Sequence, residues 1–458
     1  MIDWAVTGNL LALILRDRET ISSDAERLFL SSQRFRNIDY ELSPLPVAVA
    51  ASSLSNHSVM VERYMGLLER VISLYRTNPD VRAFFRLGPE EESLVRADTS
   101  LTPAIRIARL DGYIAQSDGK IRFLENNTDC PAGILFTERL NRLVDSITES
   151  TVARAGVKVV NTPLDKPDCA RQELIAAYRA QGGDESNPVI AVLQIKDKSN
   201  VESREMAKEF SDRGTPTFIA DPREAIISST GVYLEGKKVD LIWNKVNTVY
   251  WNQLAADSPS LLGRWADVIA SQKVCHVNSF GARYVTESKL CAAFLQEPEF
   301  GDYFEDSDRE FLRQVLPWSR KVEPGKRVDY EGQNWDISKL LLSRQSDFVL
   351  KQQYDIRGDG VTVGRSVDRD QWVERVKRAA REGHTAQEFI AGQAYPVMTM
   401  QAGMNVTPMT ASLDSFVFGG RLAGLGSKAG PGFKVNLFQG GVKLAVRAYS
   451  LAQENLRP

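Results

Sequence analysis

The amino-acid sequence predicts a mixed α/β (α+β) fold, and three patterns support this expectation. Residues 1–104 are mostly helical in pattern, and in residues 62–76 apolar side chains recur every three or four positions. Residues 105–127 alternate between apolar and polar side chains around a turn, which is typical of a β-hairpin. Residues 155–280 alternate short apolar runs with helical segments, as in a parallel sheet covered by helices.

The length and charge of the chain limit what it can be. Its 458 residues exceed what one hydrophobic core holds, so we expect several domains. A net charge of −2 creates no strong field toward nucleic acid or an anionic membrane, and neither is expected as a partner. The apolar run at residues 10–15 is too short to span a membrane. Four cysteines and three histidines show no zinc-ligand spacing, which favours reduced thiols and a cytoplasmic protein.

The segment at residues 348–364 is the most informative stretch of the sequence. A buried strand ends at Lys351, a turn follows that contains Asp355, Gly358 and Gly360, and a second strand comes after it. An ammonium group beside glycines, whose backbone can be approached closely, is the combination that a polyphosphate needs. The alternative is a surface hairpin whose lysine is only solvated.

The return strand of the first hairpin, residues 121–127, ends in polar side chains. Alternation places Phe123, Glu125 and Asn127 on one face of this strand. Two oxygen-bearing side chains two residues apart can reach one hard cation, and Mg²⁺ prefers such ligands. The alternative is an edge strand that runs into a polar loop.

Further candidate residues lie at the carboxyl end of a predicted parallel strand, residues 239–245. Ligands of open α/β sheets bind at that end, so Asn244 and Lys245 are predicted substrate contacts. Tyr250 and Trp251 are expected in the loop that follows.

The last third of the chain contains a helix at residues 370–382, ended by Gly383, and then a strand at residues 386–390. Residues 424–432 are rich in glycine but lack the spacing of a P-loop. We expect either a mobile loop that covers phosphates or a plain surface loop there. From Val442 onward we expect a helix.

The order of these motifs resembles that of one family, the circularly permuted ATP-grasp ligases, which includes eukaryotic-type glutathione synthetase and glutathionylspermidine synthase. The likeness covers roughly residues 105–445. It departs from the family where Asp359 separates the two glycines, and where Asp355 is shorter than the usual glutamate.

The resemblance implies a circularly permuted ATP-grasp fold with an inserted Rossmann-like domain. The implied regions are a helical region at 1–104, a first part of the ATP-grasp domain with metal ligands at 105–154, an α/β substrate (pre-ATP-grasp) domain at 155–280, and the main nucleotide-binding region with its lid at 281–458.

The resemblance also implies roles for individual residues. Glu125, Asn127 and Asp355 would hold Mg²⁺, and Lys289 and Lys351 would contact the phosphates of ATP, with Gly358 and Gly360 in the loop beside them. Gln387, Glu388, Phe389 and Ile390 would form the adenine hinge, Gly424 to Gly432 with Lys428 would be the lid, and Asn436 with Gly440 and Gly441 would lie near the phosphates. Arg109 would face the carboxylate that is phosphorylated. Asp111 and Asp129 are candidate bases for the amine.

The predicted activity is that of an ATP-dependent carboxylate–amine ligase, which forms an amide through an acyl phosphate. The expected substrates are a small amino-acid-like acid and an amine, and the resemblance favours a homodimer. Two alternatives stay open: a phosphotransferase on the same scaffold, and a nucleotide-binding protein without catalysis.

Overall fold

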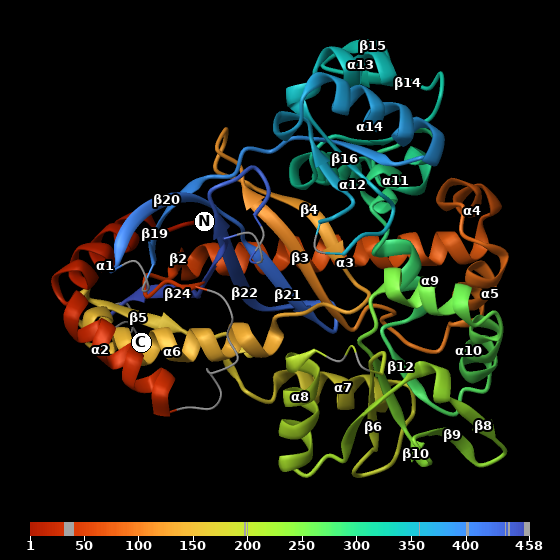
Figure 1. Cartoon of the computed structure of the whole chain (residues 1–458), viewed down its shortest axis with the longest axis horizontal. Helices are drawn as coiled ribbons and strands as arrows, with labels where there is room; N and C mark the ends of the chain where they lie inside the picture. The colour runs from red at the N-terminus through yellow and green to blue at the C-terminus, as the bar shows by residue number, and fades with distance from the viewer. Residues whose placement is uncertain are drawn as a thin grey trace.

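The computed structural model describes residues 1–31, 41–196, 198, 200–356, 358–399, 403–435, 437 and 440–452. It has the mixed α/β fold that the sequence predicts, with helices around several separate sheets (Figure 1). Among the described residues, no helix has the length and apolar character that crossing a membrane requires.

The largest sheet joins the first hairpin to the end of the chain. Its strands run in the order β1-β23-β22-β21-β3-β4, and β20 pairs with both β22 and β19. The strands are β1 (Glu41–Leu42), β3 (Ile107–Ile114), β4 (Ile121–Asn127), β19 (Ala394–Thr399), β20 (Asn405–Ala411), β21 (Asp414–Phe418), β22 (Arg421–Gly430) and β23 (Val442–Leu444). Because β21 pairs with β3, residues some 300 positions apart in the sequence lie on neighbouring strands.

The middle of the chain forms the predicted parallel sheet, in the order β12-β11-β6-β7. Its elements are β6 (Ile190–Leu193), β7 (Thr217–Ala220), β11 (Leu241–Asn244) and β12 (Cys275–Val277), with helices α7 (Cys169–Ala180), α8 (Val201–Asp212), α9 (Thr248–Asp257) and α10 (Ser260–Ala270). A small antiparallel sheet adds β8 (Ile226–Ser228), β9 (Gly231–Leu234) and β10 (Lys237–Val239). Tyr250 and Trp251 lie in α9 and not in a loop, because the Asn247 side chain caps a helix there.

A third, antiparallel sheet runs in the order β13-β18-β16-β17. Its elements are β13 (Ser319–Lys321), β16 (Phe348–Lys351), β17 (Val361–Val363) and β18 (Thr385–Glu388), with β14 (Arg327–Tyr330), β15 (Gln333–Asp336), α13 (Ile337–Ser343) and α14 (Arg369–Glu382) beside it. Gly383 ends α14 with a φ of 71°, as predicted. Figure 1 shows this unit at the top of the view, with α11 (Leu290–Phe294) and α12 (Asp306–Val315) near it.

The first hundred residues are mostly helical, as predicted. The helices are α1 (Trp4–Arg16), α2 (Arg18–Ser31), α3 (Ala51–Thr77), α4 (Pro79–Phe85) and α5 (Pro89–Ala97). Met65, Leu68, Ile72 and Tyr75 of α3 are buried in the core. The first and last parts of the chain meet in a sheet of β2 (Val47–Ala50), β24 (Val446–Leu451) and β5 (Val157–Val160). The long helix α6 (Ile134–Arg154) follows β4, and short helices are η1 (Pro163–Asp165), η2 (Pro222–Glu224), η3 (Ala282–Thr286), η4 (Pro298–Tyr303), η5 (Gln345–Asp347) and η6 (Gly364–Ser366).

Two predicted elements near the end of the chain are wrong. The glycine-rich segment is no lid, because residues 424–430 lie in strand β22. A Cβ on Gly424 would lie 2.5 Å from the Leu164 Cβ, so the glycine permits close packing of this strand. Residues from 442 form strands β23 and β24 instead of a helix. Both faces of these strands are buried, which removes the alternation that would have identified them.

The two cavities and the candidate active site

The β3–β4 hairpin places four polar side chains together. Arg109 is the cross-strand partner of Asn127, and Asp111 is the partner of Glu125. Directly opposed residues of an antiparallel pair have their side chains on the same face. The hairpin therefore presents the Arg109 guanidinium, the Asn127 amide and the carboxylates of Asp111 and Glu125 on one face. The predicted shared face of Glu125 and Asn127 is confirmed.

A β-bulge beside this face changes the position of Phe123. The register shifts between Asp111 and Gly112, so that Leu124 has no partner of its own. Phe123 stacks on Tyr64 at 5.1 Å between ring centroids, and the Tyr64 hydroxyl donates to Asn126 Oδ1 at 3.1 Å. The prediction that Phe123 shares a face with Glu125 is therefore wrong, because the extra residue interrupts the alternation.

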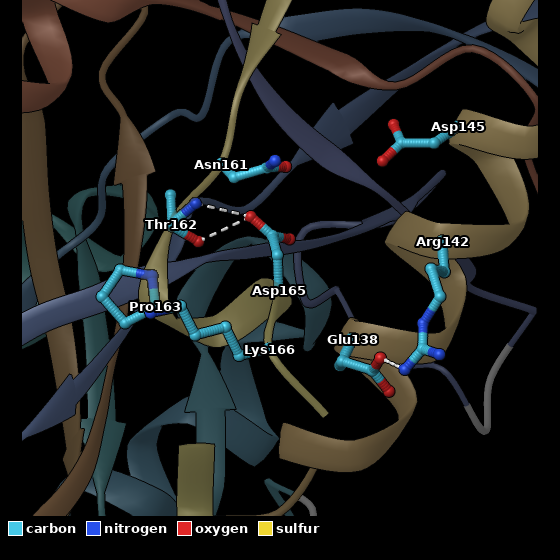
Figure 2. A pocket seen from close by; sticks show the side chains of 8 residues that line it. All are labelled: Glu138, Arg142, Asp145, Asn161, Thr162, Pro163, Asp165 and Lys166. Atoms are coloured by element: carbon cyan, nitrogen blue, oxygen red, sulfur yellow. Dashed lines mark hydrogen bonds and ion pairs between the residues drawn. The ribbon is translucent and has the colours of Figure 1, made fainter. Parts of the chain in front are cut away.

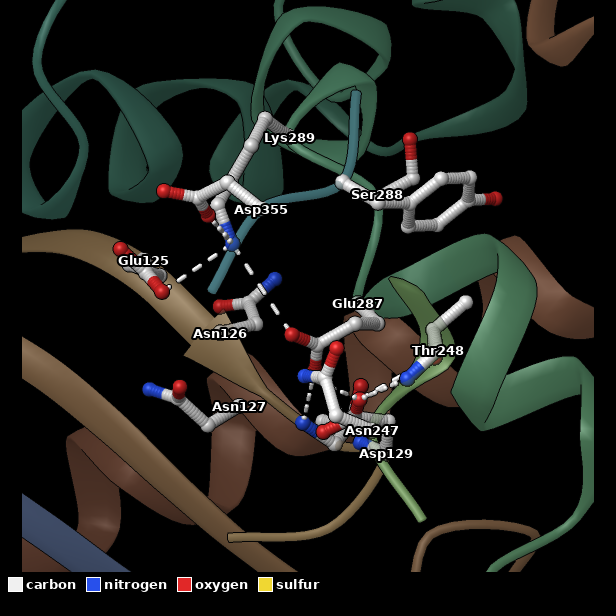
Figure 3. Close-up of polar contacts among 12 residues, drawn as sticks. Glu125, Asn126, Asn127, Asp129, Asn247, Thr248, Glu287, Ser288, Lys289 and Asp355 are labelled. Carbon is white, nitrogen blue, oxygen red and sulfur yellow. Dashed lines mark hydrogen bonds and ion pairs between the residues drawn. The ribbon is translucent and has the colours of Figure 1, made fainter. Parts of the chain in front are cut away.

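Lys289 lies among three carboxylates (Figure 3). Its Nζ is 3.0 Å from Glu125 Oε1, 3.5 Å from Asp355 Oδ1 and 3.9 Å from Glu287 Oε1. Burial opposes the charged ammonium, but the carboxylates outweigh it and raise the pKa of Lys289. Burial raises the pKa of Asp355, against the effect of Lys289. The structure thus brings together one predicted phosphate contact and two predicted metal ligands.

Lys351, at the end of β16, points toward the same place from the third sheet. Its Nζ donates to the carbonyl oxygen of Leu124 at 2.7 Å, the residue that the bulge leaves unpaired. Burial lowers the pKa of Lys351 to about 8, and the positive charge of Lys289 acts in the same direction. A narrow cavity between the sheets joins these groups. It is lined by Tyr64, Phe123, Leu124, Glu125, Asn126, Ser288, Lys289, Ala292, Leu316, Lys351 and Gln387.

Asp111 is the centre of a second cluster of charges. Arg109 Nε and Lys428 Nζ donate to it at 2.6 and 2.9 Å, and Asn127 Nδ2 donates at 3.0 Å. Lys428 also donates to Asp414 at 2.8 Å. Although burial raises the pKa of Asp111, Arg109 and Lys428 together hold it well below its usual range. Lys428 thus contacts this cluster from a central strand and not from a lid.

The predicted metal ligands are only partly assembled. Glu125 and Asp355 lie around Lys289, whereas the Asn127 amide donates to Asp111 and to the Arg109 carbonyl. In the described part of the chain, no group of three or more His, Cys, Asp or Glu side chains is placed to hold a metal ion. Asp355 Oδ2 is nevertheless buried without a hydrogen-bond partner. Mg²⁺ is usually held by one or two carboxylates together with phosphate oxygens and water, so Glu125 and Asp355 fit such a site.

The predicted adenine hinge lies at the end of β18, where Gln387 and Glu388 pair with Val349 and Phe348 of the strand that carries Lys351. The Gln387 side chain donates to Ser319 Oγ at 3.1 Å and lines the cavity. The N–H groups of Glu388 and Phe389 donate to the carbonyls of Trp318 and Asp347, at 2.8 and 2.7 Å. These two N–H groups already donate to carbonyls of the protein itself. Recognition of the adenine base by residues 387–390, Ile390 included, stays a prediction.

Gly358 and Gly360 close the loop after Lys351. Gly358 has a φ of 75°, and its carbonyl accepts from Lys434 Nζ at 2.7 Å. A Cβ on Gly360 would be 2.7 Å from the Cβ of Asp355. The glycines therefore allow the loop to fold back tightly against Asp355. The predicted contact Asn436 lies outside the described residues.

Asn244, Lys245 and Asp129 support a loop instead of lining the cavity. Asn244 is fully buried and bonds to His276 Nε2 at 3.2 Å, so the structure gives no access for a substrate there. Lys245 Nζ donates to the carbonyls of Cys130 and Pro131. Asp129 Oδ2 accepts from the Thr248 N–H at 2.9 Å at the start of α9. These residues fix the loop that contains Ala132, and the carbonyl of Ala132 accepts a hydrogen bond from Arg109.

Four functional candidates were missed in the sequence: Arg283, Glu287, Asp414 and Lys443. Arg283 is buried and donates to the carbonyls of Asp129 and Asn244, at 2.9 and 3.0 Å. Glu287 Oε2 accepts from the N–H of Thr128 at 2.6 Å. For Lys443 a signal existed, because it is a single charge within an otherwise apolar run from Val442 to Val446.

A larger cavity of about 470 Å³ lies elsewhere, between α6 and η1 (Figure 2). It is lined by Glu138, Arg142, Asp145, Asn161, Thr162, Pro163, Asp165 and Lys166, which include no predicted site residue. Buried Arg447 binds Asp145, Asp165 and Asn161 at its edge. Most of its charges are thus paired with one another, which favours the narrower cavity as the candidate active site.

Comparison with known proteins supports a family likeness at the level of the fold. No family model matches the chain, and no curated protein matches it by sequence. The glutathione synthetase-like effector GSS30 from Globodera pallida, in its apo form, aligns over 93% of this chain and 96% of its own, with 13% identity and a TM-score of 0.57.

Two further structures align less well. A proposed gamma-glutamylcysteine synthetase from Methylobacillus flagellatus KT covers 84% of this chain and 88% of its own, with 12% identity and a TM-score of 0.41. The ATP-grasp ligase PsnB, complexed with a minimal precursor, covers 59% and 92%, with 9% identity and a TM-score of 0.31. These TM-scores are too low to support an argument.

The chain therefore has the fold of a glutathione synthetase-like protein. The resemblance predicted from the motif order is confirmed at that level. The circular permutation, the inserted domain and the division into four regions stay predictions.

Proposed function

We propose that the chain is an ATP-dependent carboxylate–amine ligase, which forms an amide and releases ADP and phosphate. One observation supports this above all. Lys289 and Lys351, from different parts of the chain, line one narrow cavity with Glu125, and Asp355 lies against Lys289. Two ammonium groups beside two carboxylates are the complement of a polyphosphate with a bound cation.

The present ion pairs would be exchanged when the nucleotide binds. Lys289 is paired with Glu125 and Asp355. When a polyphosphate and a cation enter together, the lysine gains a phosphate and the carboxylates gain the cation, so each group keeps an opposite charge beside it. Lys289 and Lys351 would then bind phosphate oxygens, while Glu125 and Asp355 would hold Mg²⁺. Bound there, Mg²⁺ neutralises charge on the transferring phosphoryl group.

The acid would react next to this cavity. Its carboxylate attacks the γ-phosphate to give an acyl phosphate and ADP, and the amine then displaces phosphate. Asp111 is the cross-strand partner of Glu125, which places the cations bound to Asp111 beside the cavity. Arg109 and Lys428 would stabilise negative charge on the reacting groups. The low pKa of Asp111, held by Arg109 and Lys428 against the effect of burial, makes it a weak proton acceptor for the amine.

The test is ADP release with panels of small acids and amines. It should require both, and ¹⁸O from the labelled carboxylate should appear in phosphate. We expect Lys351→Met and Asp355→Asn to lower kcat/KM by about a hundredfold or more, because each removes charge that stabilises phosphoryl transfer. Lys158→Met, at an exposed position of β5, is the matched control and should retain full activity.

Two results would contradict the ligase activity, and a third would contradict a residue assignment. A stable phosphorylated acid without amide would indicate a phosphotransferase. ATP binding without ADP release, across all acid and amine pairs, would indicate a nucleotide-binding protein. Full activity of either site variant would remove that residue from the mechanism.

A further inference from the structure

Lys443 is a buried cation that has no role in the function proposed above. It lies on β23 as the cross-strand partner of Lys428, and only 6% of it is exposed. Within the described ranges, its ammonium group makes neither a hydrogen bond nor an ion pair. Burial lowers the pKa of Lys443 to about 8, opposed by Asp414 and reinforced by Lys428 and Arg109. A buried ammonium without a partner is costly unless something else compensates for it.

Lys443 and Arg109 converge on the space beside Gly133, where a methyl group would be in ordinary contact with both. A Cβ placed on Gly133 would lie 3.9 Å from Lys443 Nζ, 4.0 Å from the nearest Arg109 guanidinium nitrogen and 3.7 Å from Phe416 Cζ. No closer atom of another part of the described chain occupies that space. It is thus bounded by an ammonium group, a guanidinium group and the edge of an aromatic ring.

The nearby carboxylates do not balance these cations. Among the described residues, Asp111 and Asp414 face Arg109, Lys428 and Lys443, and Glu125 also acts on Arg109 but is paired with Lys289 at 3.0 Å. Both oxygens of Asp111 accept from Arg109, and one also accepts from Lys428. A further carboxylate near Gly133, that of Glu202, accepts from the N–H groups of Gly133 and Leu135, at 2.9 and 3.1 Å. The excess positive charge therefore favours an anion.

We propose that Lys443 and Arg109 together form a subsite for a carboxylate of the acid substrate, with Lys443 as a specificity-determining residue. This inference rests on the proposed ligase function, since the acid must reach the Glu125 and Lys289 cavity. The subsite lies on the same sheet face as that cavity, because Arg109 and Asp111 are successive residues of that face of β3. A carboxylate held by two buried cations makes charge-assisted hydrogen bonds, which are stronger than neutral ones.

The first test is kinetic. Lys443→Met removes the charge while keeping a similar length, and we expect it to raise KM for the acid by about tenfold to a hundredfold. The KM for ATP should stay within about twofold. Lys443→Arg keeps the charge and should restore much of the loss. Lys158→Met, on exposed β5, serves as the control and should match the original protein. Unchanged KM for the acid in Lys443→Met would overturn the subsite while leaving the ligase intact.

The second test needs no catalysis. Melting temperatures are compared in sodium glutarate, a dicarboxylate probe, and in sodium chloride of equal ionic strength. Glutarate should stabilise the protein and Lys443→Arg but not Lys443→Met. Equal stabilisation of all three would overturn the inference. If glutarate acts as expected and no acid supports ADP release, the ligase proposal fails and the anion subsite stands.

Discussion

Three buried lysines differ in pKa because of their neighbours. Burial, together with nearby cations, lowers the pKa of Lys351 and of Lys443 to about 8. Burial acts on Lys289 too, but the carboxylates of Glu125, Glu287 and Asp355 reverse its effect and raise the pKa. Lys289 therefore stays charged over the whole physiological range, whereas the other two lose their charge in mildly alkaline solution.

The lowered pKa of Lys443 predicts a pH-dependent affinity for the acid. Arg109, Lys428, Asp414 and Asp111 surround it. The pKa values of Arg109 and Lys428 are raised and that of Asp111 is lowered, so these three groups keep their charges between pH 7 and 9.5. As pH rises through about 8, Lys443 is deprotonated, so KM for the acid should rise with a limiting slope of about tenfold per pH unit. A KM profile measured from pH 7 to 9.5 checks this. The rise in KM should be absent in Lys443→Met and displaced to higher pH in Lys443→Arg. A rise with the same midpoint in both variants and in the original protein would contradict the role of Lys443.

The lowered pKa of Lys443 should also make the free energy of unfolding rise with pH. The pKa of Lys443 is about 8 in the folded protein, against an ordinary lysine value of 10.5, so the unfolded chain binds more protons between these values. The free energy of unfolding should therefore gain up to about 1.4 kcal/mol per pH unit from this lysine between pH 8 and 10.5. Urea unfolding at several pH values measures the free energy of unfolding of Lys443→Met and of the original protein. The amount by which the variant is more stable should shrink between pH 8 and 10.5. A difference independent of pH would contradict the assignment.

At the scale of elements, small backbone features decide where the site residues lie. The bulge at Leu124 turns Phe123 to the opposite face and frees the Leu124 carbonyl for Lys351. In β22, glycines allow neighbouring groups to approach closely: a Cβ on Gly426 would lie 2.9 Å from Phe416 Cε2. The glycines of this segment therefore leave room for tightly packed neighbours, whereas the glycines of a lid would allow its backbone to move.

The strand assignment of β22 can be tested with Gly424→Ala. The added Cβ would meet Leu164 Cβ at 2.5 Å, so we expect the free energy of unfolding to fall by about 1–3 kcal/mol. Activity per folded molecule should change little. Gly66→Ala is a matched control inside α3, where a Cβ meets nothing within 4 Å, and it should stabilise the protein by up to about 1 kcal/mol. A loss of kcat at unchanged stability would instead support a lid.

At the scale of the whole molecule, the candidate site lies where separate sheets meet. Lys351 comes from the antiparallel sheet, Glu125 and Leu124 from the largest sheet, and Lys289 from the segment between η3 and α11. Arg283 of η3 joins the β4–α6 loop to the end of β11. The site therefore depends on the relative placement of these units, and a ligand that bridges them should stabilise the entire fold.

We therefore expect ATP with Mg²⁺ to stabilise the protein more than ATP with EDTA. At a hundredfold excess over Kd, the added stability is about 2.7 kcal/mol, and it should appear as a higher Tm. Asp355→Asn should remove most of the magnesium-dependent part, because Asp355 supplies a carboxylate to the cation. An equal Tm shift with and without Mg²⁺ would exclude a metal site at Glu125 and Asp355.

Much of the local structure could be predicted from the sequence. The strands at residues 121–127 and 217–220, the end of α14 at Gly383 and the buried face of α3 follow from alternation, helical spacing and glycine. The pairing of Glu125 and Asp355 with Lys289 agrees with the resemblance in motif order. The placement of Asn127 differs, because only the fold shows that Asp111 accepts its amide.

The sequence by itself determined the α/β class, most of the element types before β19 and the set of charged residues available for a polyphosphate, since these depend on neighbours within a few positions. Only the tertiary structure decided that residues 442–444 and 446–451 are strands, that residues 424–430 lie in β22, and that Lys443 and Arg109 approach the same space beside Gly133. The physical reason is that burial on both faces and contacts between β3, α6 and β23 depend on distant parts of the chain, which leave no local pattern.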